Sequence, residues 1–418
     1  MKEPWPTVPL KSLVSVTREV VDPSSLIQPV DHYSIPALEA AGVAAVEDPS
    51  TIQSAKLLLV GDEVLISRLN PRKARVAEVH QSDRIKLSST EFIPLRPGPG
   101  IDRRFLRYLL LAESTRQHLD ARVQSVTRSH QRVDPEVVTS LRLGVPAVEE
   151  QRRVADFLDD QVALLDRAIH LRQQQLGLVS RRFHSEARRA TTFGLEAGPT
   201  KPTRLAWMPT MAAKWTRGRV ARSFRTGSGT TPSASQDLYF DGPYDWVNTG
   251  DLRDGLIVRP KRTVTDLALS DYSTLRRYPA GSLVIAMYGA TIGRLGLLSR
   301  PACVNQACCV LYEGTDVTTL FAFYWLLAYR DEITDLAVGA GQPNISQETV
   351  SSLPLPVPAQ FEQETIVAHL ERERERSEAL ADTLTRSISL LQERKQALIT
   401  TAVTCELDVA TASARSVA

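Results

Sequence analysis

The chain has 418 residues, more than a single hydrophobic core normally serves, so about two or three domains are expected. Its 43% hydrophobic and 23% charged residues are globular values and exclude an intrinsically disordered chain. The net charge of +2 does not by itself indicate nucleic-acid binding. The N-terminus lacks a signal-peptide core and no apolar run approaches ~18 residues, so we expect a cytoplasmic protein without a membrane partner.

Residues 1–146 are predicted to form a first mixed domain, of the α/β or α+β class. Short β-like runs such as residues 57–66 alternate with helix-like stretches such as residues 103–119. The polar loop at residues 67–73 follows one β-like run and contains no acid, so its side chains should emerge at the end of a strand. A second polar segment, residues 128–133, lies just ahead of the next helix.

Both segments have the composition of a DNA-contacting loop, because cationic side chains hold phosphates while Arg, Asn and Gln address base edges. The candidate contacts in the first domain are Arg68, Asn70, Arg72, Lys73, Arg128 and Arg132. Residues 102–132 hold seven arginines against three acids. Turns and solvated helix faces explain the same residues without DNA, so both interpretations stay open at this point.

Residues 147–193 are predicted to form a long helix that begins after Pro146. Its apolar residues recur at alternating four- and three-residue steps, which is coiled-coil spacing. This seam consists of Leu158, Val162, Leu165, Ile169, Leu176, Val179 and Phe183, with Arg172 as its only interruption. About 35 residues at ~1.5 Å each give a rod of about 50 Å, which is long enough to act as a spacer. The alternative is an amphipathic helix that packs only on its own domain.

A polar segment with two glycines and two prolines, residues 194–204, is predicted to link the two halves of the chain. A second mixed domain is expected at residues 205–357. The counterparts of the two polar segments are the loop at residues 286–294 and the segment at residues 340–345. The candidate DNA contacts in this domain are Tyr288, Thr291, Arg294, Gln342 and Asn344.

Residues 358–408 are predicted to form a second spacer helix, and residues 409–418 a flexible tail. One heptad position of this helix holds Leu370, Leu384, Leu391 and Leu398. Arg374 and Lys395 lie close to this row and weaken the seam.

An internal repeat relates the two halves. Residues 145–151 recur as residues 357–363 at an offset of 212, and about fifty residues align without an insertion. Trp5 and Trp215 open the two halves at an offset of 210. The halves match best along the helices and differ most inside the domains, which indicates duplication followed by divergence of whatever each half recognises. An internal pseudo-two-fold repeat is therefore expected.

Catalytic motifs are missing from the sequence. The chain contains no Gly-Lys dipeptide, and the glycines of residues 224–229 lack the strand and helix that flank a nucleotide-binding turn. The seven histidines show no metal-binding pairing, and the cysteines lack CxxC spacing. These cysteines are Cys303, Cys308, Cys309 and Cys405. We therefore expect no catalytic residue, metal site or cofactor in this chain.

With these features, the sequence resembles the specificity subunits of type I restriction-modification systems. The segments that carry the resemblance are residues 66–72, 288–293, 304–306, 342–346, 353–363 and 397–404. It covers nearly the whole chain, and the duplicated Pro-x-x-x-Glu-Gln helix start is its most specific part.

In that family each half is a target recognition domain that reads one part of a bipartite DNA site. The paired helices form an antiparallel coiled coil that fixes the distance between the parts. The resemblance implies double-stranded DNA, two methyltransferase subunits and restriction/translocase subunits as partners. S-adenosylmethionine, ATP and Mg²⁺ would bind to those subunits, and the whole complex would be an adenine-N6 DNA methyltransferase and ATP-dependent endonuclease. Subunit contacts are expected at Glu150, Gln151, Glu362 and Gln363.

The chain departs from the family pattern in two places. Cys405 stands where the family usually has a glycine after its second helix. Gly177 and the arginine-rich residues 180–189 could either weaken the first helix or form a docking surface. A non-catalytic interaction scaffold without DNA sequence specificity is the alternative function, and a stand-alone methyltransferase or nuclease is a distant third.

Overall fold

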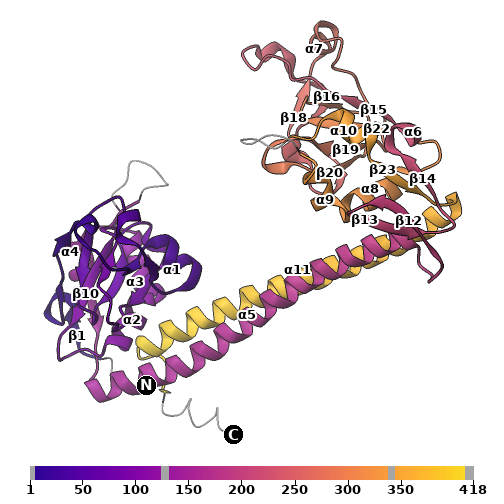
Figure 1. Ribbon diagram of the computed structural model, residues 1–418. Coiled ribbons are helices and arrows are strands. Elements are labelled where there is room, and N and C mark those ends of the chain that lie inside the picture. The colour runs from indigo at the N-terminus through magenta and orange to yellow at the C-terminus, as the bar shows by residue number, and fades with distance from the viewer. Residues whose placement is uncertain (1–4, 124–130, 338–343, 410–418) are drawn as a thin grey trace. The chain divides into compact units, whose positions relative to one another are not determined.

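The chain folds into two compact units, each with a mixed α/β domain and a stretch of both long helices (Figure 1). The computed structural model describes residues 5–123, 131–337 and 344–409. Unit 1 comprises residues Met1–Gln173 and Thr385–Ala418, and unit 2 comprises residues Gln174–Leu384. The α/β (α+β) fold class predicted from the sequence is confirmed. In the described part of the chain, no helix combines the length and apolar character needed to cross a membrane.

Unit 1 contains two sheets and a pair of strands that close the domain. The antiparallel four-stranded sheet has the order β2 (Val14–Val16), β10 (Phe92–Pro97), β7 (Val64–Ser67) and β8 (Val76–Glu78). The five-stranded sheet has the order β3 (Val20–Val21), β6 (Lys56–Leu59), β9 (Lys86–Ser88), β4 (Val30–Tyr33) and β5 (Ala45–Glu47). In this second sheet β4 and β9 are parallel. The closing pair is β1 (Thr7–Pro9) with β11 (Arg142–Gly144).

Unit 2 has a similar arrangement of sheets, which differs from unit 1 in the strands at the sheet edges. Its five-stranded sheet has the order β15 (Arg225–Ser228), β22 (Cys308–Tyr312), β19 (Leu283–Ala286), β20 (Leu295–Leu298) and β17 (Gly255–Ile257). Its three-stranded sheet has the order β18 (Arg262–Val264), β16 (Phe240–Val247) and β21 (Cys303–Val304), with β16 and β21 parallel. The closing pair is β14 (Thr216–Arg219) with β23 (Pro354–Val357).

The repeat inferred from the sequence is present in the strand order. The order β2-β10-β7-β8 of unit 1 corresponds to β15-β22-β19-β20 of unit 2, and the parallel pair β4–β9 corresponds to β16–β21. The tryptophans that open the two halves take equivalent places, because the ring of Trp5 contacts Phe105 and the ring of Trp215 contacts Phe321. The two domains therefore share one frame.

Short helices pack on these sheets. Those of unit 1 are α1 (Ile35–Ala41), α2 (Arg103–Leu111), α3 (Glu113–Asp120) and α4 (Pro135–Thr139). Those of unit 2 are α6 (Val220–Ser223), α7 (Asp266–Asp271), α8 (Thr319–Ala328), α9 (Arg330–Thr334) and α10 (Gln347–Ser352). The helices α2 and α8 are equivalent: the first is capped by the side chain of Asp102 and the second by that of Thr318, and each supplies the apolar face that covers the sheet holding β7 or β19.

The two long helices are α5 (Val148–Phe193) and α11 (Gln360–Val403). In unit 1 they pack antiparallel, because Leu158 shares a core with Ile399 while Lys395 pairs with Asp166, with 2.6 Å between Nζ and Oδ1. In unit 2, Ala190 and Phe183 share a core with Ile366 and Leu370. There too, His369 Nε2 lies 2.7 Å from Glu186 Oε1. Both units thus confirm the antiparallel pairing of the helices, which pack on their own domains as well as on each other.

The segment expected to be a linker is partly structured. Within residues 194–204 the chain already enters β12 (Thr200–Leu205), which forms a hairpin with β13 (Met208–Ala212). The composition of the segment hid this strand, but Met208 and Met211 are buried in the core of unit 2 and hold the hairpin there.

Both long helices end in a left-handed residue. Gly194 directly follows α5 with φ 84°, and Cys405, two residues after the end of α11, has φ 66°. The N–H groups of Glu406 and Leu407 both donate to the carbonyl of Thr401, which closes the turn. The helix stop therefore forms without glycine, at the conformational cost that a side chain carries in this region.

The core of unit 2 holds tyrosines and thiols that burial keeps neutral. Burial raises the pKa of Cys303 to about 11, and that of Cys309, Tyr278 and Tyr324 to about 12 each. In the unfolded chain these groups ionise at about pH 8.5 to 10. The unfolded state therefore releases protons first as the pH rises, which lowers the free energy of unfolding.

We accordingly expect the stability of unit 2 to fall steadily from about pH 9 towards pH 12. The measurement is the urea midpoint, followed by tryptophan fluorescence, across this range. Replacing Cys309 by alanine removes one of the groups and should make the decline less steep. A midpoint that stays constant between pH 9 and pH 11 would contradict the prediction.

Candidate nucleic-acid interface

In unit 1 the structure brings the two predicted polar segments together. The loop after β7 lies beside the segment that leads to α4: the N–H of Val133 donates to the carbonyl of Arg68 (2.9 Å), and the N–H of Asn70 donates to the carbonyl of Gln131 (2.7 Å). Leu69 and Arg132 form an isolated antiparallel bridge. Arg128 lies outside the described residues.

The basic residues of this loop differ in exposure and partners. Arg72 and Lys73 are exposed, whereas Arg68 is half-buried and its Nε makes no hydrogen bond. Arg75 is almost buried and holds the loop, because its Nη1 donates to the carbonyl of Leu69 (3.0 Å) while its Nη2 donates to Glu39 Oε1 (2.6 Å). This contact lowers the pKa of the Glu39 carboxyl. A cavity of about 480 Å³ opens here, and its charged lining consists of Glu39, Arg72, Lys73, Arg75 and Arg116.

Unit 2 has an equivalent surface made from different residues. Tyr288 and Asn344 form an isolated antiparallel bridge, and the N–H of Ile345 donates to the carbonyl of Met287 (2.7 Å). Arg294 is exposed on the same loop, at the start of β20. Thr291 is half-buried. Gln342 lies outside the described residues.

An arginine also holds the loop of unit 2. Arg330 donates from Nε to the carbonyl of Gly293 (3.0 Å) and from Nη1 to Asp254 Oδ2 (3.0 Å). Gly293 has φ 75°, and an added Cβ would lie 2.7 Å from a Thr334 methyl carbon, so the position requires glycine. The loop that carries Tyr288 and Arg294 is therefore fixed by contacts from outside it.

A turn that sequence reasoning did not assign to this surface borders it in both units. The N–H of Arg68 donates to the carbonyl of Glu91, and the N–H of Met287 donates to the carbonyl of Ala307, each over 2.8 Å. These carbonyls follow β9 and β21 at equivalent places in the two domains. In unit 1 the carboxylate of Glu91 pairs with Arg132, with 2.6 Å between Nη2 and Oε1. The sequence gave no sign of this pairing, because Glu91 is a single acidic residue in a loop.

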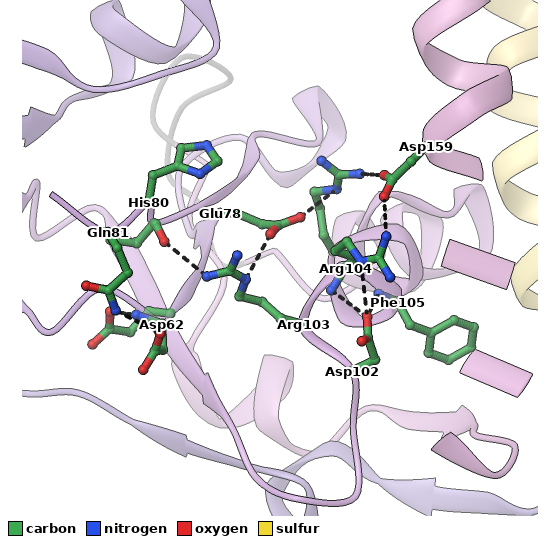
Figure 2. A network of polar contacts seen from close by, with 12 residues as sticks. Asp62, Glu78, His80, Gln81, Asp102, Arg103, Arg104, Phe105 and Asp159 are labelled. Atoms are coloured by element: carbon green, nitrogen blue, oxygen red, sulfur yellow. Dashed lines mark hydrogen bonds and ion pairs between the residues drawn. The ribbon is translucent and has the colours of Figure 1, made fainter. Parts of the chain in front are cut away.

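Several arginines of residues 102–132 form ion pairs inside unit 1 (Figure 2). Arg103 and Arg107, from α2, both reach Glu78, at 2.9 Å and 3.2 Å. Arg104 and Arg107 reach Asp159 on α5, at 2.8 Å and 2.7 Å. The basic excess of this stretch therefore ties the domain to its long helix, and these three arginines are not candidates for DNA contact.

The paired glutamines at the two helix starts are buried anchors. The Gln151 amide accepts from the Asp102 N–H (2.8 Å) and donates to the carbonyls of Gly100 and Pro146. The Gln363 amide accepts from the Thr318 N–H (2.7 Å) and donates to the carbonyls of Asp316 (2.7 Å) and Pro358 (3.0 Å).

Neither glutamine side chain is exposed to solvent, so neither has a surface to offer a partner subunit. Their predicted place in a subunit interface is corrected to a structural role. Each amide ties the N-cap residue of the domain helix, Asp102 before α2 or Thr318 before α8, to the start of a long helix.

The adjacent glutamates keep some exposure. Glu362 accepts from Trp215 Nε1 (2.9 Å) and pairs with Lys214 Nζ (2.7 Å). Glu150 forms an ion pair with Arg153 one turn further along α5. Each carboxylate leaves 15–18% of its side chain open.

The glycines of residues 224–229 lie in and beside a strand and do not form a loop around a ligand. Gly227 belongs to β15, and an added Cβ would lie 2.3 Å from the Tyr278 hydroxyl oxygen. A Cβ on Gly229 would lie 1.6 Å from the carbonyl oxygen of Val304. Close packing therefore accounts for both glycines. All four cysteines are free thiols, and three of them are buried.

These features define a protein built from a duplicated domain, in which each copy pairs two polar segments. Residues 215–385 match the family model of the type I restriction modification DNA specificity domain. The match confirms, for this region, the resemblance stated from the sequence. No curated protein sequence matches the chain.

Solved structures show that the fold of the whole chain is shared. A chain from work on complex assembly and conformational transition of the type I R-M system is 17% identical, with a TM-score of 0.76, over 97% of this chain and 99% of that one. The HsdS subunit from Thermoanaerobacter tengcongensis is also 17% identical, with a TM-score of 0.50, over 96% of this chain and 97% of that one.

Proposed function

We propose that this protein is the sequence-recognition subunit of a type I restriction-modification complex and reads a bipartite DNA site with an unread gap. One observation carries the proposal: both units pair the loop after β7 or β19 with the segment ahead of α4 or α10, in the same frame but with different residues. A repeated frame with different loop residues is what two readers of different sequences require.

The residues on these paired segments are of the types that read DNA. Exposed Arg72, Lys73 and Arg294 suit phosphate contacts, and Asn344 suits a base edge. The candidate contacts remain Arg68, Asn70, Arg72, Lys73, Arg128, Arg132, Tyr288, Thr291, Arg294, Gln342 and Asn344. Arg75 and Arg330 already fix the two loops through contacts from outside them. DNA binding would therefore have to order few loop residues, which lowers the entropic cost of binding.

The duplicated frame also supports a scaffolding role. A repeat offers two copies of the same surface, which suits two methyltransferase subunits. Glu150 and Glu362, the partly exposed glutamates at the two helix starts, are the candidate contacts of this kind. Restriction/translocase subunits would join this assembly. S-adenosylmethionine, ATP and Mg²⁺ would act in those partners, and this chain would supply recognition and not catalysis.

Methylome sequencing of a host that expresses the chain with its methyltransferase subunit tests the proposal. We expect adenine methylation at a motif of two short defined parts separated by a gap of fixed length. Methylation of a continuous motif would contradict the bipartite reading.

If the chain instead acts as a protein-interaction scaffold, the complex should bind DNA without sequence preference. Deleting the chain should then leave the methylated motif unchanged. A gapped motif that disappears with this chain excludes the scaffold alternative.

A further inference from the structure

Arg132 is held in one orientation by two independent sets of bonds. Its backbone bridges to Leu69, and the flanking residue Val133 donates its N–H to the carbonyl of Arg68 (2.9 Å). Its guanidinium is bound by Glu91: Nε lies 3.0 Å from Oε2, and Nη2 lies 2.6 Å from Oε1. Glu91 is fixed in turn, because its carbonyl accepts from the N–H of Arg68 (2.8 Å).

This contact uses only one edge of the guanidinium. An arginine has five N–H donors in a planar fork, and Glu91 occupies the edge formed by Nε and Nη2. The edge formed by Nη1 and the second N–H of Nη2 remains, and 43% of the side chain is exposed. Two parallel donors on a fixed planar edge match the O6 and N7 acceptors of guanine in the major groove.

The carboxylate argues against a simple phosphate contact. A phosphate is attracted by net positive charge, and the Arg132–Glu91 pair has none. Glu91 would also repel a nearby phosphate. An oriented but neutral pair is of little use for charge neutralisation and well suited to reading a base edge.

Unit 2 shows that the two residues belong together. The place of Arg132 is taken there by Asn344, which bridges to Tyr288, and the place of Glu91 is taken by Ala307, whose carbonyl accepts from Met287. The carboxylate is therefore absent where the arginine is absent. Asparagine is a residue type that pairs with adenine and needs no such support.

We propose that Arg132 reads a guanine in the major groove of one part of the recognition site, with Glu91 as its positioning residue. The inference rests on the proposed function of the chain as a DNA-recognition subunit. It adds the identity of one base and assigns a role to Glu91.

Methylome sequencing of variants in the assembled methyltransferase complex gives the first test. The wild-type motif should contain a G·C pair in the part read by unit 1. Arg132→Lys keeps the charge but loses the fork, so it should relax that one position. Glu91→Gln should relax the same position to a smaller extent. The other part of the motif should stay unchanged in both variants, which shows that the complex is folded and assembled.

Arg300 provides a matched control. It is bound by Asp245 through the same Nε and Nη2 edge, and 55% of its side chain is exposed, but it follows the far end of β20 from the reading loop. Arg300→Lys should therefore leave every position of the motif unchanged.

The second test changes the DNA and uses the wild-type complex, so its result does not depend on the folding of a variant. A duplex in which 7-deazaguanine replaces the proposed guanine lacks the N7 acceptor, and the wild-type complex should bind it roughly ten-fold more weakly. The Arg132→Lys complex should show no further loss. Two results would overturn the inference while leaving the proposed function intact. One is a gapped motif without G·C in either part. The other is an Arg132→Lys complex that loses as much affinity for the 7-deazaguanine duplex as the wild-type complex does. An ungapped motif would instead contradict the proposed function itself.

Discussion

Replacing Gln363 by alanine is expected to lower the free energy of unfolding of unit 2 by about 3 kcal/mol. The substitution leaves the N–H of Thr318 and the carbonyls of Asp316 and Pro358 without the amide that now satisfies them. The side chain has no solvent exposure, so water replaces these bonds only if the helix start separates from the domain.

Urea unfolding followed by tryptophan fluorescence measures this loss, because most of the tryptophans report on unit 2. They are Trp207, Trp215, Trp246 and Trp325, while Trp5 lies in unit 1. The control is Gln360→Ala, an exposed glutamine three residues earlier, which should change stability by less than ~0.5 kcal/mol. If Gln363→Ala unfolds like the control, the structural role of the buried amide is wrong.

The two glutamines also show what the sequence could have revealed. The family resemblance led to the expectation that Gln151 and Gln363 lie in a subunit interface. The signal that was present is the repetition: the same glutamine follows a proline by five residues in both halves, whereas the surrounding domains diverge. Positions that a duplicated frame retains are more often those that hold the frame.

The long helices were predicted closely because their information is local. The heptad seam and the proline at the entrance predicted residues 147–193, and α5 spans Val148–Phe193. The second helix was predicted to reach residue 408 but ends at Val403. Leu407 and Val409 continue the apolar pattern, yet they fold back onto the core of unit 1 after the left-handed Cys405.

The candidate interface was predictable only in pieces. Each polar segment stood out by composition, but the bridges Leu69–Arg132 and Tyr288–Asn344 join residues more than fifty positions apart. Such pairings depend on the strand order and not on local sequence. For the same reason the role of Glu91 was out of reach.

Reversing the charge of Arg294 is expected to weaken DNA binding at least roughly ten-fold without changing the stability of unit 2. Arg294 is exposed on the loop between β19 and β20, and within the described residues its guanidinium makes no hydrogen bond or ion pair. The substitution Arg294→Glu thus removes a free cation from the proposed interface and adds an anion, while no internal contact is lost. The measurement is fluorescence anisotropy of the assembled complex with a duplex that carries its methylated site.

Arg68→Glu is the comparison variant that distinguishes a loss of DNA affinity from a loss of structure. It makes the same charge reversal at a half-buried side chain whose Nε is buried. We expect Arg68→Glu to lower the urea midpoint of unit 1 together with DNA affinity, since a carboxylate there is partly removed from water. A salt series adds a second criterion: for Arg294→Glu the slope of log affinity against log salt should become shallower by about one. An Arg294→Glu complex with wild-type affinity and slope would show that this loop serves only the fold, because a free cation facing DNA cannot be reversed without an electrostatic cost.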